Sequence, residues 1–251
     1  MNGLAWALVA SVAILTPAEA VGISSCGQTV PPGEVGVLQA DLVCPSVIGV
    51  HLGPGATLDM NGHSISAGPV GVRCDRSRCG IVGPGEITGA SGCAIDSALG
   101  VPIFIFATDL QLHDNGCGIG AGSPHEVTVR RVTIRANKGD GITGPRPDGA
   151  GHIHTFDTLI TGNGGIGVFA QRFRLFASTV QGNGGIGVVS LRAFGALRTG
   201  ASVTGNDSAN GIDLATHKKP HILDGTCGRS AMVDDSFTVN PATTWHVCAG
   251  D

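Results

Sequence analysis

A short pattern recurs five times within residues 104–212, and it constrains the fold more than any other feature of the chain. Each copy ends in Asn, and the residue three positions before that Asn is always aliphatic. The copies read LQLHDN, VTIRAN, TLITGN, STVQGN and ASVTGN, ending at Asn115, Asn137, Asn163, Asn183 and Asn206. Successive asparagines are 22, 26, 20 and 23 residues apart, and a Gly-aliphatic pair follows each one. Self-similarity at this period, in strand-like segments, predicts a β-solenoid.

Strand alternation sorts the side chains around each Asn. Positions three and five before the Asn should point inward, and positions two, four and six before it should point outward. The side chains three before each Asn are therefore expected to superpose in one internal column, made of Leu112, Ile134, Ile160, Val180 and Val203. The asparagines themselves are expected to stack into a ladder of amide hydrogen bonds.

Composition supports a turn-rich fold and excludes some partners. The chain has 41 glycines without a collagen-like triplet, which is typical of strands punctuated by turns. The net charge is −4, and no basic run is longer than two residues. That balance gives no electrostatic footprint for nucleic acid or for an anionic membrane surface.

Residues 1–20 have the pattern of an export signal. The apolar block at residues 4–15 is too short to span a bilayer, and residues 18–20 read Ala-Glu-Ala, a small-x-small cleavage site. No Lys or Arg precedes the block, which departs from the usual pattern. No other apolar segment approaches membrane length, so we expect a secreted or periplasmic protein with no membrane span in the mature chain.

The eight cysteines are an even number suited to disulfides in an oxidising compartment. Cys93 and Cys117 each lie two residues before an isoleucine of one inward column, so they would sit on adjacent rungs about 4.8 Å apart, within disulfide range. Bonds joining Cys26 to Cys44 and Cys227 to Cys248 would close loops at the two ends, leaving Cys74 and Cys79 as a local pair. Metal binding is the weaker alternative, because no CxxC or paired-His spacing is present.

Several segments carry a family resemblance: CGQTV (26–30), LVCP (42–45), LDMNGHSI (58–65), the GNGGIGV repeats and the closing CGR…WHVC (227–248). Together they resemble secreted bacterial right-handed parallel β-helix repeat proteins of the pectin-lyase-like superfamily. The resemblance covers nearly the whole mature chain and implies the fold. It does not fix the function, because that architecture hosts lyases, hydrolases, epimerases and adhesins.

We therefore predict an all-β protein, a single-stranded right-handed parallel β-helix (solenoid) of about eight to nine short coils with disulfide-pinned ends. The expected segments are a signal peptide (1–20), an N-terminal disulfide-pinned cap (21–46), the parallel β-helix (47–215) and a C-terminal cap (216–251). Caps that cover the terminal strand edges favour a monomer.

Charged side chains gather on the outward positions of three rungs. Six residues before each Asn, the outward column contains Asp109, Arg131, Asp157, Ala177 and Gly200. Two residues before each Asn, the second outward column contains His113, Arg135, Thr161, Gln181 and Thr204. The alternation predicts that Asp109, Arg131 and Asp157 are vertical neighbours. It also predicts that His113 and Arg135 lie beside them on the same sheet.

Such a patch contains the groups that a uronate polysaccharide lyase requires. A cation must neutralise the sugar carboxylate, a base must remove the adjacent proton, and an acid must protonate the leaving oxygen. Arg131 or Arg135 could neutralise, and His113 is a suitable base because an imidazole titrates near neutrality. Asp109 and Asp157 could orient the arginines or hold Ca²⁺ together with loop carbonyls. With the resemblance, this predicts a secreted enzyme that acts on an acidic, uronate-containing polysaccharide by β-elimination.

Two alternatives use the same residues. An inverting glycoside hydrolase would use Asp109 and Asp157 as its two carboxylates, since two rungs separate their backbones by about 9.6 Å. A solvated sheet face would also place opposite charges on neighbouring strands, because such pairs add small stability. The protein would then be a non-catalytic surface or carbohydrate-binding scaffold.

Further candidates for substrate binding are His152, His154 and Lys138. The two histidines flank Ile153 and so point to one face, whereas Lys138 follows Asn137 in a turn, where charges usually face water. The mature chain has one Trp and no Tyr, so any aromatic platform for a sugar would have to be Phe. Four phenylalanines suit either a platform or the solenoid interior: Phe169, Phe173, Phe176 and Phe194.

Overall fold

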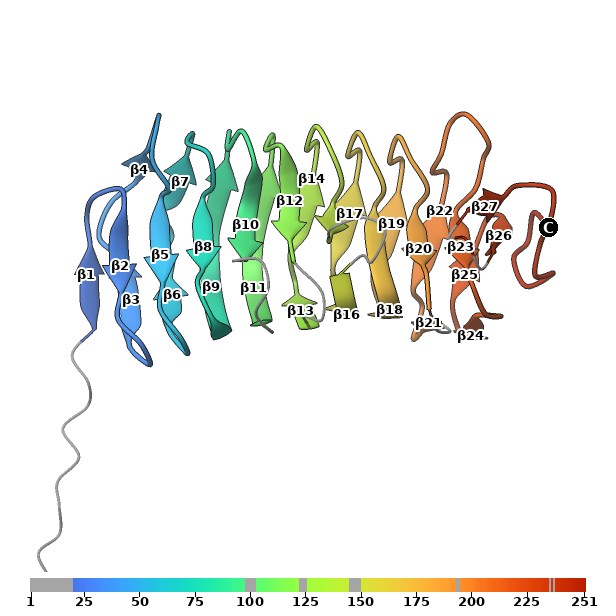
Figure 1. Cartoon of the computed structure of the whole chain (residues 1–251), viewed down its shortest axis with the longest axis horizontal. Coiled ribbons are helices and arrows are strands. Elements are labelled where there is room, and N and C mark those ends of the chain that lie inside the picture. Colours follow the sequence, from blue (N-terminus) through green and yellow to red (C-terminus); the bar gives the residue numbers. More distant parts are fainter. Residues whose placement is uncertain are drawn as a thin grey trace, which may run out of the picture.

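The structure is a computed structural model that describes residues 20–97, 103–121, 126–144, 150–192, 195–234, 236 and 238–251. Within these ranges the protein is all-β and forms a parallel β-solenoid of about 8 turns, which confirms the predicted fold class. Figure 1 shows the rungs stacked along one long axis, from β1 at the blue end to the β26 region at the red end. None of the described segments is a helix long and apolar enough to cross a membrane. The signal peptide predicted at residues 1–20 lies almost wholly outside the described ranges.

Each rung contributes strands to three parallel sheets, which form the faces of the solenoid. The first sheet consists of β2 (Gln28–Val30), β5 (Val50–Leu52), β8 (Val72–Cys74), β10 (Cys93–Ser97), β12 (Cys117–Gly120), β15 (Ile142–Thr143), the start of β18 (Val168–Phe176), β20 (Val188–Ser190), β23 (Leu214–Thr216) and β26 (Ser230–Val233).

The second sheet carries the grooves described below. It consists of β1 (Val21–Ile23), β3 (Val35–Leu38), β6 (Thr57–Asp59), the start of β9 (Ser77–Thr88), the start of β11 (Ile103–His113), β13 (Glu126–Arg130), β16 (Ala150–Phe156), the rest of β18, β21 (Ala196–Arg198) and β24 (His221–Leu223).

The third sheet contains the segments that end at the recurrent Asn. It consists of β4 (Leu42–Val43), β7 (Ser64–Ser66), the ends of β9 and β11, β14 (Thr133–Arg135), β17 (Leu159–Thr161), β19 (Thr179–Gln181), β22 (Ser202–Thr204) and β25 (Thr226–Cys227). β27 (Val239–Asn240) pairs antiparallel with β26 and closes the C-terminal end.

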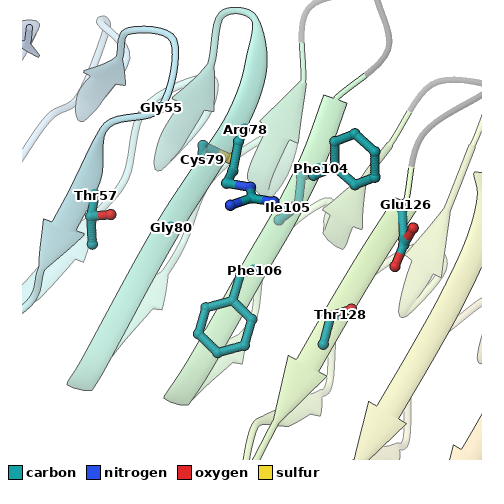
Figure 2. A pocket seen from close by; sticks show the side chains of 10 residues that line it. All are labelled: Gly55, Thr57, Arg78, Cys79, Gly80, Phe104, Ile105, Phe106, Glu126 and Thr128. Carbon is teal, nitrogen blue, oxygen red and sulfur yellow. The ribbon is translucent and has the colours of Figure 1, made fainter. Parts of the chain in front are cut away.

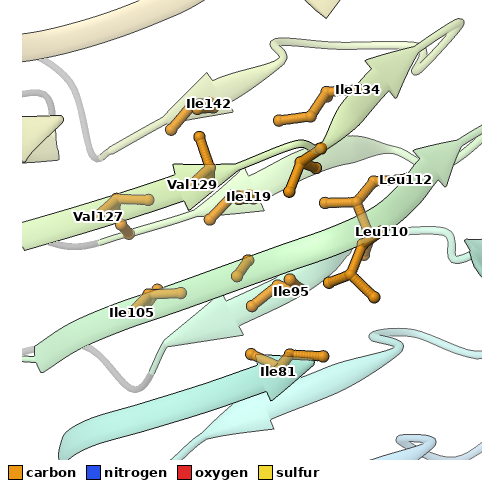
Figure 3. Close-up of a cluster of buried hydrophobic side chains, with 14 of the residues drawn as sticks. Ile81, Ile95, Ile105, Leu110, Leu112, Ile119, Val127, Val129, Ile134 and Ile142 are labelled. Carbon is orange, nitrogen blue, oxygen red and sulfur yellow. The ribbon is translucent and has the colours of Figure 1, made fainter. Parts of the chain in front are cut away.

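The predicted inward column is confirmed by the register of the third sheet. Leu112 pairs with Ile134, Ile134 with Ile160, Ile160 with Val180 and Val180 with Val203, and all five side chains are fully buried. The column meets aliphatic side chains from the other two sheets, as Figure 3 shows for the middle rungs. Each such side chain contributes about 1.5–3 kcal/mol by leaving water, so the stacked columns are the main source of stability.

The recurrent asparagines form the predicted ladder at the corner between the third and first sheets. The Nδ2 of each donates to the Oδ1 of the next, at 3.1 Å from Asn115 to Asn137 and 2.8 Å from Asn137 to Asn163. The ladder continues at 2.9 Å to Asn183 and 2.8 Å to Asn206. Each Oδ1 also accepts from the backbone N–H of the preceding Asn, so the side chains satisfy polar groups that the solenoid buries.

Asp213 ends this ladder and corrects one detail of the predicted repeat. The sequence pattern places Gly211-Ile212 in the Gly-aliphatic position, but Val188 pairs with Leu214, so Asp213 occupies the glycine position instead. The Oδ1 of Asp213 accepts from the backbone N of Asn206 at 2.8 Å and from its Nδ2 at 2.9 Å. On earlier rungs only Gly fits. A Cβ at Gly141 would lie 2.5 Å from the Gly167 carbonyl oxygen.

The structure forms all four predicted disulfides: Cys26–Cys44, Cys74–Cys79, Cys93–Cys117 and Cys227–Cys248. Cys93 and Cys117 are register partners on β10 and β12, with Cα atoms 4.3 Å apart, as their shared position before an inward isoleucine predicts. No cysteine is free. Four disulfides indicate an oxidising, extracellular environment.

The two ends continue the solenoid further than the sequence pattern suggests. Residues 21–46, expected as a cap, contribute β1 to β4, which pair in parallel with the next rung. At the other end, β24 to β26 extend the sheets through residue 233, beyond the expected boundary at 215. The tail then folds over the last rung, where the Trp245 Nε1 donates to the Thr216 carbonyl at 3.2 Å.

Candidate functional site

Asp109, Arg131 and Asp157 lie on successive rungs, as predicted, but at a corner instead of on a sheet face. All three have left-handed backbone conformations, with φ of 58°, 50° and 49°, and the β9–β11 register shifts between Thr108 and Leu110. This conformation turns the chain from the second sheet into the third. The fifth member of the column is Thr199, not Gly200, because the pairing of Phe176 with Arg198 places Thr199 beside Ala177.

Arg131 is held by Asp109 in a two-pronged ion pair. Its Nε and Nη2 donate to the two Asp109 carboxylate oxygens at 2.6 and 2.7 Å. The Asp109 hydrogen bond raises the pKa of Arg131, and the Arg131 hydrogen bond lowers the pKa of Asp109. Arg131 therefore remains a cation and cannot act as a general base. For Asp109 to bind a calcium ion, or the water of an inverting hydrolase, Arg131 would first have to be displaced from its carboxylate.

His113 belongs to a different cluster. Its Nε2 lies 2.8 Å from Glu86 Oε1 and its Nδ1 lies 2.6 Å from Asp114 Oδ2, and the side chain is only 12% exposed. Both ring nitrogens are thus engaged by carboxylates, neither of which the sequence pattern singled out. Arg135 is the register neighbour of His113 but is exposed, and the described residues give it no ion-pair partner. The five predicted catalytic residues therefore form two separate groups, and no hydrogen bond between described residues joins them.

The outer face of the second sheet carries two adjoining grooves instead. The first, which we call the Phe106 groove, has a volume of about 360 Å³ and is shown in Figure 2. Its lining residues lie on β6, β9, β11 and β13 and just before β6. They are Gly55, Thr57, Arg78, Cys79, Gly80, Phe104, Ile105, Phe106, Glu126 and Thr128. The second, the arginine groove, has a volume of about 320 Å³ and is lined by Glu126, His152, His154, Arg172, Phe173, Arg174, Ala196, Arg198 and His221. Glu126 lines both, so the two grooves adjoin at this residue.

Strand register places the polar side chains of the arginine groove in two rows along the axis. Glu126 pairs with His152, and His152 with Arg172. In the second row Thr128 pairs with His154, and His154 with Arg174. Neighbouring members of a row are about 4.8 Å apart, so the rows present regularly spaced cations and imidazoles along the solenoid.

The arginine groove is positively charged in an acidic protein. Arg172, Arg174 and Arg198 are exposed and form no ion pair with any described carboxylate, and Glu126 is the single acid in the groove lining. The whole chain has a net charge of −4. Burial lowers the pKa of His154, and Arg174 and His152 act in the same direction while Glu126 opposes them. His154 is therefore a neutral imidazole at neutral pH.

Of the predicted substrate-binding residues, the two histidines lie in this groove and Lys138 does not. His152 and His154 share the outer face, as their spacing predicts, whereas Lys138 is exposed in the turn after Asn137. Phe169 and Phe173 are buried and Phe176 is partly buried, while Phe194 lies outside the described residues. Phe104 and Phe106, which the sequence did not single out, are the exposed aromatic side chains of the site.

The described residues offer no ready metal centre. They include no group of three or more His, Cys, Asp or Glu side chains arranged to hold an ion. Comparisons of the chain with protein-family models, curated proteins and solved structures found no match. Any assignment of function therefore depends on the chemistry of the two grooves.

Proposed function

We propose that this protein is exported by the signal at residues 1–20 and binds an acidic, uronate-containing polysaccharide along the outer face of the second sheet. The observation that supports this proposal is the arginine groove, where three exposed arginines lack carboxylate partners among the described residues, in a chain whose net charge is −4. Arg side chains bind carboxylates in two-pronged fashion. Unpaired arginines on an acidic protein favour a ligand that brings its own negative charges.

The shape of the site favours a polymer over a small anion. The Phe106 and arginine grooves share Glu126 and together span the strands from β6 to β24. Cationic and imidazole groups recur on successive rungs about 4.8 Å apart. A chain molecule lying along the solenoid axis would meet these groups repeatedly, whereas a single sugar acid would contact only one or two rungs.

Titration calorimetry with polygalacturonate and alginate tests this proposal, with uncharged dextran as the control ligand. The Arg172→Ala/Arg174→Ala variant should lose at least about tenfold in affinity, because charge-assisted hydrogen bonds contribute about 1.5–3 kcal/mol each. Added salt should weaken binding by the wild type. Arg135→Ala, which removes an exposed arginine from the third sheet, should have little effect. Equal binding by the double variant, or loss only in Arg135→Ala, would place the site elsewhere.

β-Elimination is the second candidate function, and the state of His154 favours it. A neutral imidazole can remove the proton next to the uronate carboxylate, while Arg172 or Arg174 neutralises that carboxylate. A carbon–carbon double bond then forms as the bond to the glycosidic oxygen breaks, and this oxygen takes a proton from water. His154 and Arg174 are register partners on adjacent strands, so base and cation are close enough to act on one sugar. This assignment moves the proposed chemistry away from His113, whose two ring nitrogens are both occupied by carboxylates.

The reaction is tested by incubating the protein with a panel of uronates and following the absorbance of the unsaturated product. A lyase in the arginine groove predicts a rise that His154→Ala abolishes and Arg131→Ala leaves intact. The opposite result would support the corner cluster of Asp109, Arg131 and Asp157. New reducing ends without absorbance would indicate hydrolysis. Binding without either product would indicate a carbohydrate-binding scaffold.

A further inference from the structure

Phe106 is an exposed aromatic residue beside a rung position that has no side chain. It is 41% exposed on the outer face of β11. The register partner on the next rung toward the N-terminus is Gly80, and the partner beyond Gly80 is Thr57. Gly80 has no side chain, and the Thr57 side chain leans toward this position, so the space beside Phe106 is bounded by Thr57 and forms part of the Phe106 groove (Figure 2).

The same sheet shows what fits such a space. Phe156 and Phe176 are register partners on adjacent rungs, and their rings stack with centroids 4.9 Å apart and planes within 6° of parallel. The rung spacing of about 4.8 Å thus places two flat groups on neighbouring rungs at stacking distance. A flat ring on the rung of Gly80 would lie about one rung spacing from Phe106, which is within stacking distance.

The two grooves differ in charge. In the Phe106 groove, Arg78 and Glu126 balance each other, and Thr57 and Thr128 add neutral hydroxyl groups. In the arginine groove, three arginines face the same single Glu126. Charge complementarity therefore favours an uncharged ring in the first and a carboxylate-bearing ring in the second.

We propose that the Phe106 groove is a subsite for an uncharged sugar whose apolar face stacks on Phe106 above Gly80. The inference rests on the proposed function, because the same polymer would continue into the arginine groove. It narrows the ligand class to a heteropolysaccharide that contains both neutral sugars and uronates. A polymer made only of uronates would place a carboxylate in the neutral subsite, and its ring would stack less favourably on Phe106.

Titration calorimetry can test the subsite with two polymers, rhamnogalacturonan, in which a uronate alternates with a neutral deoxy sugar, and polygalacturonate, which contains uronates alone. Wild type should bind rhamnogalacturonan more tightly. Phe106→Ala should weaken that binding about five- to tenfold, the size of an aromatic stacking contact, and should change polygalacturonate binding less than twofold. Val43→Ala, which truncates an exposed apolar side chain of the third sheet, is the matched control and should change neither affinity.

A blocking variant checks the space itself. A Cβ at residue 80 would lie 2.9 Å from Thr57 Oγ1, so Gly80→Val is combined with Thr57→Ala to remove that contact. With folding confirmed by circular dichroism, this variant should lose the preference for rhamnogalacturonan. Retention of that preference in both Phe106→Ala and the blocked variant would overturn the subsite, even if Arg172→Ala/Arg174→Ala abolishes binding. Failure of wild type to bind any acidic polymer would instead overturn the proposed function, and the subsite with it.

Discussion

The Asn corner and the outer face of the second sheet use the same rungs in opposite ways. At the corner, the same residue type recurs from Asn115 to Asn206, every side chain is buried, and each amide satisfies its neighbour. On the second sheet, equivalent positions change from Phe104 to Glu126, His152 and Arg172. Repetition therefore marks the positions that hold the solenoid together, and departure from repetition marks the surface that is free to acquire a function.

The largest expected effect is on stability, at the centre of the ladder. Asn163 makes four side-chain hydrogen bonds, to Asn137 N and Nδ2, the Ile134 carbonyl and Asn183 Oδ1. Asn163→Ala leaves several of these buried groups without partners, so the free energy of unfolding should fall by about 3 kcal/mol or more. Urea unfolding measures this loss. Gln181→Ala, at an exposed position of the third sheet, should change it by less than about 0.5 kcal/mol. Similar values for the two variants would contradict the structural role of the ladder.

A smaller effect is expected on the binding surface when the pH is lowered. The pKa of His154 lies below the usual imidazole value, so this side chain gains its charge only as the pH falls below about 6.5. Sugar carboxylates remain ionised down to about pH 4. Affinity for polygalacturonate should therefore rise several-fold between about pH 8 and pH 5, and His154→Gln should remove the most acidic part of that rise. Calorimetry at several pH values measures it, and a pH-independent affinity would contradict this role.

The smallest effect is expected at the corner that joins the two sheets. Arg131→Ala breaks an ion pair whose side chains are 48% and 36% exposed, so solvent screens the interaction and the free energy of unfolding should fall only slightly. Polysaccharide binding should not change. Thermal unfolding and the binding assay together check both statements. A loss of binding equal to that of Arg172→Ala/Arg174→Ala would extend the functional surface onto the corner.

The sequence predicts those features whose positions are set by counting back from the recurrent Asn. Counting back from each Asn fixes which side chains stack over one another, so the Leu112 column, the ladder and the Cys93–Cys117 bond all followed from spacing alone. The second sheet did not follow, because one residue at the corner reverses the alternation. Asp109, Arg131 and Asp157 adopt left-handed conformations, and past them the odd-numbered positions counted back from Asn face outward.

This reversal explains why the sequence pattern does not predict the Phe106 groove or the arginine groove. Phe104, Glu126, His152 and Arg172 all lie eleven residues before a recurrent Asn, yet simple alternation would place them inside. The sequence does predict that His152 and His154 share a face, because two side chains that flank one residue point the same way whatever the register. The contacts of His113 with Glu86 and Asp114 depend on side-chain conformation, which spacing does not determine.

The ladder also has a direction. One N–H of each amide donates toward the C-terminal end, from Asn115 through to the carboxylate of Asp213, while the other donates back to a backbone carbonyl of the preceding rung. Aligned in this way, the amides polarise one another, and the negative charge of Asp213 strengthens the donors that point at it. Duplication of one complete rung between Asn115 and Asn206 would leave every donor facing an acceptor. The hydrogen bonds of the ladder would therefore survive the insertion or deletion of whole rungs. Such a change would also lengthen or shorten the outer grooves.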